Sequence, residues 1–246
     1  MEYYFTEETN IDLVNSRLRI DGFEFNHLIR VLRKKVNDEI TLTDGKRNIY
    51  LSKIVEVTKT EIVCEILNRE YDLNEPELRI TLFVSPLRNS DRFEFLIEKV
   101  VEIGVFEIYP LVSKYTVVKN SFSETKMSRL RKIVVAAMGQ SQRCFLPDIN
   151  NTISFDEMIK ITEGINKKIV YYEHAGKKAK HTEEVSTSEL CVLIGPEGGF
   201  DTEEIDKLIK HNWQVESLGE RKLRAETAAI ISVFEQINKY KRKVIL

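Results

Sequence analysis

The chain has 246 residues, of which 42% are hydrophobic and 9% aromatic, and its formal net charge is −2. This composition supports a buried core and excludes an intrinsically disordered chain. No apolar run approaches the roughly 18 residues that a membrane-spanning helix needs. Residues 1–8 carry neither the basic start nor the apolar segment of a secretory signal. We therefore expect a cytoplasmic protein without membrane contact, built of one large or two small domains.

The cysteines and histidines form no metal-binding pattern. The three cysteines lie far apart in the sequence, and the four histidines include no H-x-x-x-H pair. Scattered cysteines in odd number are typical of reduced thiols in a cytosolic protein. We expect no bound metal.

Basic residues are concentrated in two stretches, although the chain as a whole is slightly acidic. Residues 27–35 contain four basic residues and no acid, and residues 110–147 contain seven basic residues and one acid. Such clusters either bind the phosphates of a nucleic acid or form a solvated helix face. The charge pattern alone leaves both interpretations open.

The first 69 residues are predicted to form mostly short strands. Residues 39–43 and 53–57 alternate between apolar and polar side chains, and residues 61–67 have high β-propensity. Asp44-Gly45 indicates a hairpin turn, while residues 26–34 have apolar side chains at helical spacing. Short strands at regular spacing predict a small β-barrel.

Residues 70–77 are polar, contain one proline and are predicted to be a linker. Beyond them strands and helices alternate, which predicts an α/β domain with a mostly parallel sheet. The predicted strands are residues 78–84, 106–109 (ending at Pro110), 168–172, 191–194 and 214–217. The predicted helices are residues 90–101, 124–142, 155–161, 202–211 and 224–240.

A glycine-rich loop follows the predicted strand 191–194. Residues 193–200 read Leu-Ile-Gly-Pro-Glu-Gly-Gly-Phe, and Asp201 and Glu204 then form a capping box for the next helix. Glycines permit positive φ and close approach of a ligand to the backbone. Junctions of this kind bind ligands in α/β sheets, but the loop is neither a dinucleotide fingerprint nor a Walker A motif. A tight turn without a ligand is the alternative interpretation.

This loop and residues 218–228, Leu-Gly-Glu-Arg-Lys-Leu-Arg-Ala-Glu-Thr-Ala, resemble the two signature loops of the RsmE family. Residues 27–33, 99–105 and 137–147 also resemble family motifs, whereas residues 87–89 and 113–119 depart from the family pattern. RsmE proteins are RNA methyltransferases of the SPOUT superfamily. The resemblance therefore covers most of the chain.

The resemblance implies a particular α/β fold. Residues 1–72 would form an N-terminal PUA-like β-barrel that helps to bind RNA. Residues 78–246 would form a C-terminal SPOUT domain with a mostly parallel sheet and a deep trefoil knot. SPOUT proteins usually dimerise through this domain, so the resemblance also implies a homodimer, with the apolar face of residues 224–240 serving either the dimer interface or the core.

The implied activity is S-adenosylmethionine-dependent methylation of N3 of one uridine in small-subunit (16S) ribosomal RNA. The partner would be 16S rRNA or the assembled small ribosomal subunit. The cofactor would lie across the three loops that follow residues 168–172, 191–194 and 214–217. The implied cofactor-binding residues are Tyr172, Ile194, Gly195, Pro196, Glu197, Gly198, Gly199, Leu218, Gly219, Leu223, Arg224 and Thr227. The RNA-binding candidates are His27, Arg30, Arg33, Lys126, Arg129 and Lys132.

Methylation of uridine N3 requires removal of its proton and stabilisation of the charge that spreads over O2 and O4. Arg143 and Arg224 are candidates for that stabilisation or for binding phosphate, and Glu197 is a candidate for the base. The alternative for Glu197 is a brace within its loop, and for Arg224 an ion pair. Glu226 is expected to brace the last helix rather than to act as the base. Because N3 lies on the pairing edge, the uridine must be unpaired or flipped out.

Two other functions remain open at this stage. One is a SPOUT methyltransferase for another RNA atom, such as a ribose 2′-oxygen. The other is a non-catalytic RNA-binding factor for ribosome assembly that retains the fold. The complete Leu-Arg-Ala-Glu-Thr-Ala motif favours the N3 enzyme, and the intact glycines of both loops argue against a protein that only binds RNA.

Overall fold

The computed structural model describes residues 2–175 and 187–244. The chain divides into two compact units, one formed by residues 1–75 with 135–146 and the other by residues 76–134 with 147–246. Residues 135–146, which the sequence pattern assigned to the second domain, therefore group with the first unit. Among the described residues, no helix combines the length and apolar character needed to cross a membrane.

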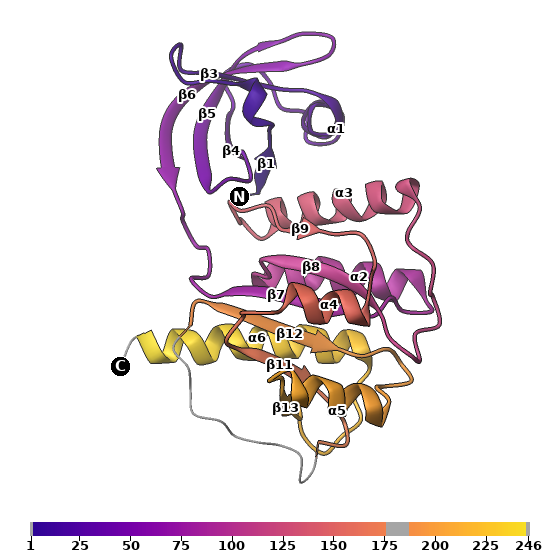
Figure 1. The fold of residues 1–246 in the computed structure, drawn as a ribbon. Coiled ribbons are helices and arrows are strands. Elements are labelled where there is room, and N and C mark those ends of the chain that lie inside the picture. The colour runs from indigo at the N-terminus through magenta and orange to yellow at the C-terminus, as the bar shows by residue number, and fades with distance from the viewer. Residues whose placement is uncertain (1, 176–186, 245–246) are drawn as a thin grey trace. The chain divides into compact units, whose positions relative to one another are not determined.

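A six-stranded sheet forms the first unit, with the strand order β1-β4-β5-β6-β3-β2 (Figure 1). Its first pair, β1 with β4, is parallel, and the remaining pairs are antiparallel. The predicted hairpin at Asp44-Gly45 is confirmed, because it connects β4 to its antiparallel neighbour β5. The elements are β1 (Tyr3–Phe5), η1 (Glu8–Asn10), β2 (Ile11–Asp12), β3 (Arg17–Ile20), α1 (Gly22–Asn26), η2 (His27–Val31), β4 (Glu39–Thr43), β5 (Asn48–Val57) and β6 (Ile62–Tyr71).

The helix predicted at residues 26–34 begins earlier and ends earlier than expected. It consists of α1 and of η2, a short π-helical segment, and the chain has left the helical conformation at Arg33, where φ is +55°. Phe25 and Leu28 on its inner side pack into the core of the sheet. The other buried side chains of this core are Tyr4, Leu18, Ile20, Ile40, Leu42, Tyr50, Ile54, Ile62 and Cys64.

Helix α3 (Glu124–Gln140) ends in the first unit, where Gly139 allows a close backbone contact. A Cβ atom at Gly139 would lie 2.3 Å from the carbonyl oxygen of Tyr3. No side chain fits this space. Because glycine has none, the last turn of α3 can lie directly against β1.

The second unit contains a sheet of parallel strands in the order β10-β8-β7-β12-β11-β13, with β9 also paired to β8. This confirms the predicted parallel sheet. The strands are β7 (Arg79–Val84), β8 (Glu107–Val112), β9 (Asp148–Ile149), β10 (Ile153–Ser154), β11 (Lys168–Tyr171), β12 (Glu189–Ile194) and β13 (Gln214–Glu216). The helices other than α3 are α2 (Ser90–Ile103), α4 (Phe155–Ile161), α5 (Thr202–Lys210) and α6 (Ala225–Val244).

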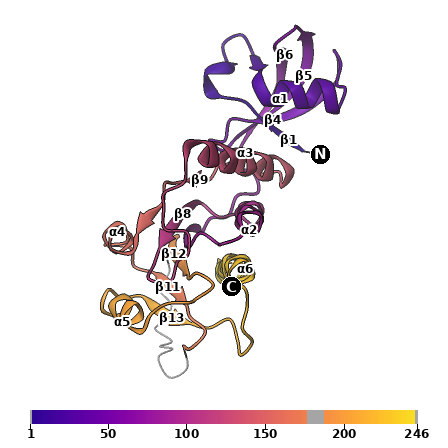
Figure 2. The same cartoon turned by 90° about the vertical axis from the view of Figure 1, so that its right-hand side faces the viewer.

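Helices cover both faces of this sheet. Figure 2 shows α2 and α6 on one face and α4 and α5 on the other. The capping box predicted at Asp201 and Glu204 is present, and a second box forms from Ser154 and Glu157 at the start of α4. Each box satisfies N–H groups that a helix start leaves unpaired. The larger core side chains include Phe83, Leu111, Met158, Val170, Leu193, Phe200, Leu208 and Trp213.

Several strand ends differ from the prediction, among them those of β8 and β6. Strand β8 does not stop at Pro110 but continues to Val112, because Leu111 and Val112 pair with β10. A proline removes only its own N–H donor, so pairing resumes after it. Strand β6 extends to Tyr71, so the polar linker begins after that residue.

Strands β12, β11 and β13 are neighbours in the sheet and run in the same direction. The loops that leave their carboxyl ends therefore meet at one edge of the sheet, which is where open α/β sheets bind ligands. The trefoil knot stays a prediction, because strand order does not specify how the last helix threads.

Candidate active site

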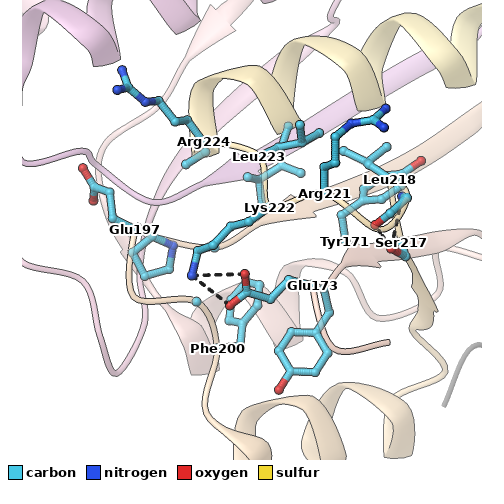
Figure 3. A pocket seen from close by; sticks show the side chains of 18 of the residues that line it. Tyr171, Glu173, Glu197, Phe200, Ser217, Leu218, Arg221, Lys222, Leu223 and Arg224 are labelled. Atoms are coloured by element: carbon cyan, nitrogen blue, oxygen red, sulfur yellow. Dashed lines mark hydrogen bonds and ion pairs between the residues drawn. The ribbon is translucent and has the colours of Figure 1, made fainter. Parts of the chain in front are cut away.

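The three loops after β11, β12 and β13 surround a pocket of about 430 Å³ (Figure 3). This volume falls within the roughly 300–1,000 Å³ typical of small-molecule sites. Of the predicted cofactor-binding residues, those that line it are Tyr172, Ile194, Gly195, Pro196, Glu197, Gly199, Leu218, Gly219, Leu223 and Arg224. Gly198 and Thr227 are not part of the lining.

Glycines let the backbone itself form part of the pocket wall. Gly199 has φ of +72° and Gly219 has φ of +110°, conformations that side-chain-bearing residues rarely adopt. A Cβ atom at Gly195 would lie 2.9 Å from the Phe200 ring, and one at Gly198 would lie 3.0 Å from Cβ of Tyr115. The glycine loop is therefore closely packed and presents peptide groups to a ligand.

An ion pair joins two of the loops at the pocket. The Nζ atom of Lys222 lies 3.3 Å from Oε1 and 3.2 Å from Oε2 of Glu173, as Figure 3 shows. The Lys222 side chain is 75% exposed, so we expect this pair to contribute little to stability. Sequence analysis named neither residue as a site candidate. Lys222 lies within the signature stretch 218–228, whereas Glu173 is a loop glutamate without a distinctive pattern.

Arg92 is another residue of the pocket that sequence analysis did not identify. It lies in the first turn of α2, and its Nε and Nη2 atoms donate to Oε1 and Oε2 of Glu226 at 2.9 and 2.5 Å. Its Nη1 atom lies 3.8 Å from Oε1 of Glu197. Burial acts to raise the pKa of Glu226, but the hydrogen bonds and charge of Arg92 outweigh it, so that pKa is lowered. The expected bracing role of Glu226 fits this arrangement.

Asp201, which caps α5, also anchors the segment that follows β8. Its carboxylate accepts hydrogen bonds from Nζ of Lys114 at 2.9 Å and from the hydroxyl of Tyr115 at 2.8 Å. The bond from Lys114, followed by those from the backbone of Glu203 and from Tyr115, lowers the pKa of Asp201 to about 2. Residues 113–119, which depart from the RsmE pattern, are thus joined by hydrogen bonds to Asp201, the residue that follows the glycine-rich loop.

Comparison with known proteins identifies the fold of this site. Residues 74–234 match the family model of the RNA methyltransferase domain, and residues 20–67 match that of the RNA methyltransferase PUA domain. The chain is 33% identical to the Ribosomal RNA small subunit methyltransferase E of Mesomycoplasma hyopneumoniae (strain 232), over 86% of this chain and 89% of that protein. The chain belongs to the RsmE family of RNA methyltransferases.

Other RsmE proteins resemble the chain over nearly its full length. The Bacillus subtilis (strain 168) protein is 28% identical over 95% of this chain and 94% of its own. The crystal structure of the Neisseria gonorrhoeae protein, solved bound to S-adenosyl methionine, has a TM-score of 0.87 at 28% identity and covers 98% of each chain. The predicted family and fold, a PUA-like unit followed by a SPOUT domain, are confirmed.

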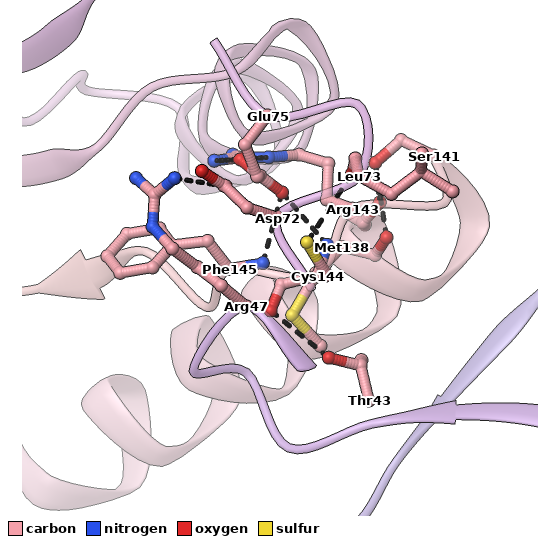
Figure 4. Close-up of polar contacts among 11 residues, drawn as sticks. Thr43, Arg47, Asp72, Leu73, Glu75, Met138, Ser141, Arg143, Cys144 and Phe145 are labelled. Carbon is pink, nitrogen blue, oxygen red and sulfur yellow. Dashed lines mark hydrogen bonds and ion pairs between the residues drawn. The ribbon is translucent and has the colours of Figure 1, made fainter. Parts of the chain in front are cut away.

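Arg143, a candidate for charge stabilisation in this RsmE chain, does not line the pocket and belongs to the first unit. It is buried, and its Nε and Nη2 atoms donate to Oε2 of Glu75 at 3.1 and 2.8 Å (Figure 4). Oε1 of Glu75 accepts from the backbone N–H groups of Cys144 and Phe145 at 2.8 and 3.0 Å. Arg143 lies in residues 137–147, the stretch that resembles a family motif. Its ion pair with Glu75 gives this arginine a structural role, which accounts for its burial without a role in catalysis.

Two of the RNA-binding candidates form ion pairs within the second unit. Arg129 donates to Oε2 of Glu94 through Nε and Nη2 at 2.9 and 2.7 Å, and Lys126 donates to Oε1 at 2.5 Å. Glu94 is nearly buried, which acts to raise its pKa, but the bonds from Arg129 and Lys126 prevail and lower it to about 2. These two cations join α3 to α2, whereas Lys132 on α3 is exposed.

The candidates in the first unit lie in η2 or just after it. Arg30 and Arg33 are exposed, and His27 is half-buried. The His27 ring lies parallel to that of Phe23, with centroids 6.4 Å apart, and Phe23 is 65% exposed. Within residues 2–175 and 187–244, no group of three or more histidine, cysteine or acidic side chains could hold a metal ion.

Proposed function

We propose that the protein methylates N3 of one uridine in the RNA of the small ribosomal subunit, with S-adenosylmethionine as the methyl donor. The observation that carries this proposal is the pocket whose wall is formed by both RsmE signature loops. The proposed substrate is 16S rRNA, either free or in the assembled subunit, and the protein would act in the cytoplasm.

The chemical groups that line the pocket suit those of S-adenosylmethionine. The backbone of Gly195, Gly199 and Gly219 lines the pocket and offers hydrogen bonds to the neutral, polar parts of such a ligand. Leu218 and Leu223 offer apolar contact to a flat base. The lining carries charges of both signs, with two acidic residues and four basic ones, which suits a ligand that has both a positive sulfonium and a negative carboxylate. The charged lining residues are Glu173, Glu197, Arg92, Arg221, Lys222 and Arg224. Bound there, the donor supplies an electrophilic methyl group.

Two side chains of the pocket are suited to act on the uridine. Figure 3 shows Glu197 and Arg224 on the same side of the pocket. Glu197 would take the N3 proton while the bond between N3 and the methyl carbon forms and the bond between sulfur and that carbon breaks. Arg224, which is exposed, would donate to the oxygen on which negative charge develops. Arg143 is not part of this proposal because Glu75 and its surroundings hold it in the first unit.

RNA contact outside the pocket is proposed for the exposed basic residues rather than for those that are already paired. Arg30, Arg33 and Lys132 are exposed and can neutralise phosphates. Lys126 and Arg129 would first have to break their bonds to Glu94. His27 would act at most through its ring beside Phe23.

We also propose that the protein is a homodimer that associates through the second unit. Only part of the apolar face of α6 is buried. Val233 and Ile237 are buried, whereas Ile231 is 40% exposed and Phe234 is 58% exposed. An exposed pair of large apolar side chains on a helix favours an interface. Sedimentation of the wild type and of Phe234→Glu tests this, since a monomeric wild type would contradict it.

The activity is tested by incubating the purified protein with tritiated S-adenosylmethionine and small ribosomal subunits from cells that lack the gene, followed by nucleoside analysis. Label recovered as 3-methyluridine at one site is the expected result. Label on a ribose would instead identify a 2′-oxygen methyltransferase. No label on either subunits or free 16S rRNA, together with no saturable cofactor binding, would identify an RNA-binding factor.

A further inference from the structure

We propose that Arg92 is the positioning residue for Glu197 in methyl transfer, an inference that rests on the function proposed above. Arg92 comes from the start of α2, far in sequence from both signature loops, yet its side chain lines the pocket. It contacts one carboxylate from each loop region, Glu197 after β12 and Glu226 at the start of α6. Arg92 therefore connects the two signature motifs.

The contact with Glu226 fixes the guanidinium plane of Arg92. Glu226 is only 8% exposed and lies in the first turn of α6, immediately after the loop of residues 218–224. The two parallel hydrogen bonds, from Nε at 2.9 Å and Nη2 at 2.5 Å, hold a planar group more strictly than one bond could. With Nε and Nη2 committed, Nη1 is left to face Glu197.

Glu197 is anchored through one of its two oxygens. Oε1 accepts a hydrogen bond from the backbone N–H of Arg88 at 3.2 Å, and Nη1 of Arg92 lies 3.8 Å from the same atom. One contact comes from the segment that leads into α2 and the other from the first turn of that helix. They orient the carboxylate of Glu197, and the proposal assigns proton uptake to its other oxygen, Oε2.

Arginine is the residue type that this geometry requires. Bridging two carboxylates needs three N–H directions in a rigid plane, which a guanidinium provides. A lysine at the same position would keep the charge but act as a point donor on a flexible chain. A lysine at position 92 should therefore orient the two carboxylates, Glu226 and Glu197, less well than arginine does. The kcat of Arg92→Lys should lie between those of the wild type and Arg92→Gln.

A double-mutant cycle separates positioning from general structural support. We would measure kcat for transfer of tritiated methyl groups in the wild type, Arg92→Gln, Glu197→Gln and the double variant. If Arg92 acts through Glu197, Arg92→Gln lowers kcat about tenfold in the wild type but less than about twofold when Glu197 is already changed. The same factor in both backgrounds would overturn the proposal.

Arg88→Gln is the matched control. Arg88 holds Glu197 through its backbone N–H, which this substitution keeps, and its side chain is exposed. Arg88→Gln should change kcat by the same factor in the wild type and in the Glu197→Gln variant, whatever the size of that factor. Thermal unfolding of each variant is followed in parallel, and if Arg92→Gln does not fold, Arg92→Lys replaces it in the cycle.

The outcomes distinguish this inference from the proposed function. Label recovered on an atom other than uridine N3 would contradict the proposed product, while the cycle would still decide whether Arg92 acts through Glu197. Label on N3 with independent effects of the two substitutions would leave the proposed function intact and overturn the role of Arg92. Absence of any methyl transfer by the wild type would overturn both.

Discussion

Arg143 and Glu75 form a buried ion pair in which the guanidinium donates two hydrogen bonds to one carboxylate oxygen, at 3.1 and 2.8 Å. The side chains are only 5% and 1% exposed. The other oxygen of Glu75 accepts two backbone N–H groups, from Cys144 and Phe145. One carboxylate thus joins the end of the linker to the chain that leaves α3.

Removal of one partner should destabilise the first unit strongly. Arg143→Ala would leave the Glu75 carboxylate buried without its cation, and such a substitution typically costs about 3–5 kcal/mol. We expect a large fall in the midpoint of thermal unfolding, with cofactor affinity nearly unchanged in the fraction that remains folded. Calorimetry and a cofactor titration measure the two quantities. A stable Arg143→Ala protein that had lost only methyl transfer would instead support the catalytic role that its motif suggested.

Gly199 should be required for cofactor binding beyond its contribution to stability. Gly199→Ala places a side chain where φ is +72°, which costs about 1–2 kcal/mol, and adds a methyl group to the pocket wall. We expect the dissociation constant for S-adenosylmethionine to rise at least about tenfold, or about 1.4 kcal/mol.

Gly164→Ala is the matched control for that substitution. Gly164 also has positive φ, +84°, but no atom lies within 4 Å of its Cβ position, and it is not part of the pocket. It should show a similar loss of stability with unchanged cofactor affinity. Equal effects of both substitutions on affinity would show that the result at Gly199 reflects only general destabilisation.

Glu94 should contribute a pH-dependent part of the stability. Its folded pKa, about 2, lies below the ordinary value of 4.5, so the folded state favours the ionised carboxylate. Its stabilisation is therefore fully present above about pH 5 and is lost as the pH falls through 4.5 toward 2. The difference in unfolding midpoint between the wild type and Glu94→Gln should shrink over that window. Glu163→Gln, which removes an exposed carboxylate from the same unit, should show no comparable trend.

Lys132 and Lys126 should respond differently to removal of their charge, although both lie on α3. Lys132→Gln removes an exposed cation, so RNA affinity should fall and the slope of log affinity against log salt should decrease by about 0.7–0.9 for each phosphate that is no longer neutralised. Lys126→Gln removes a partner of Glu94 and should lower stability with little effect on that slope. Filter binding over a salt series, with thermal unfolding, measures both. A larger change in slope for Lys126 would mean that RNA displaces Glu94.

The features that the sequence by itself determined rest on signals contained within a few residues. The capping box of Asp201 and Glu204 spans one helical turn, and the hairpin connection that contains Asp44-Gly45 is the short segment of residues 44–47. The alternation of strands and helices predicted the parallel sheet, and the glycine-rich loop after β12 marked one wall of the pocket. Each depends on backbone conformation or periodicity, which neighbouring residues largely set.

Only the tertiary structure decided which charged side chains are available for function. Arg92 meets Glu226 across 134 positions of sequence, and Arg143 meets Glu75 across 68. Lys126 and Lys132 are both lysines of one helix, yet only the ion pair of Lys126 with Glu94 of α2 shows that the first is already paired. An ion pair depends on distance and orientation in space, and no local pattern encodes the partner that the fold brings to a charged side chain.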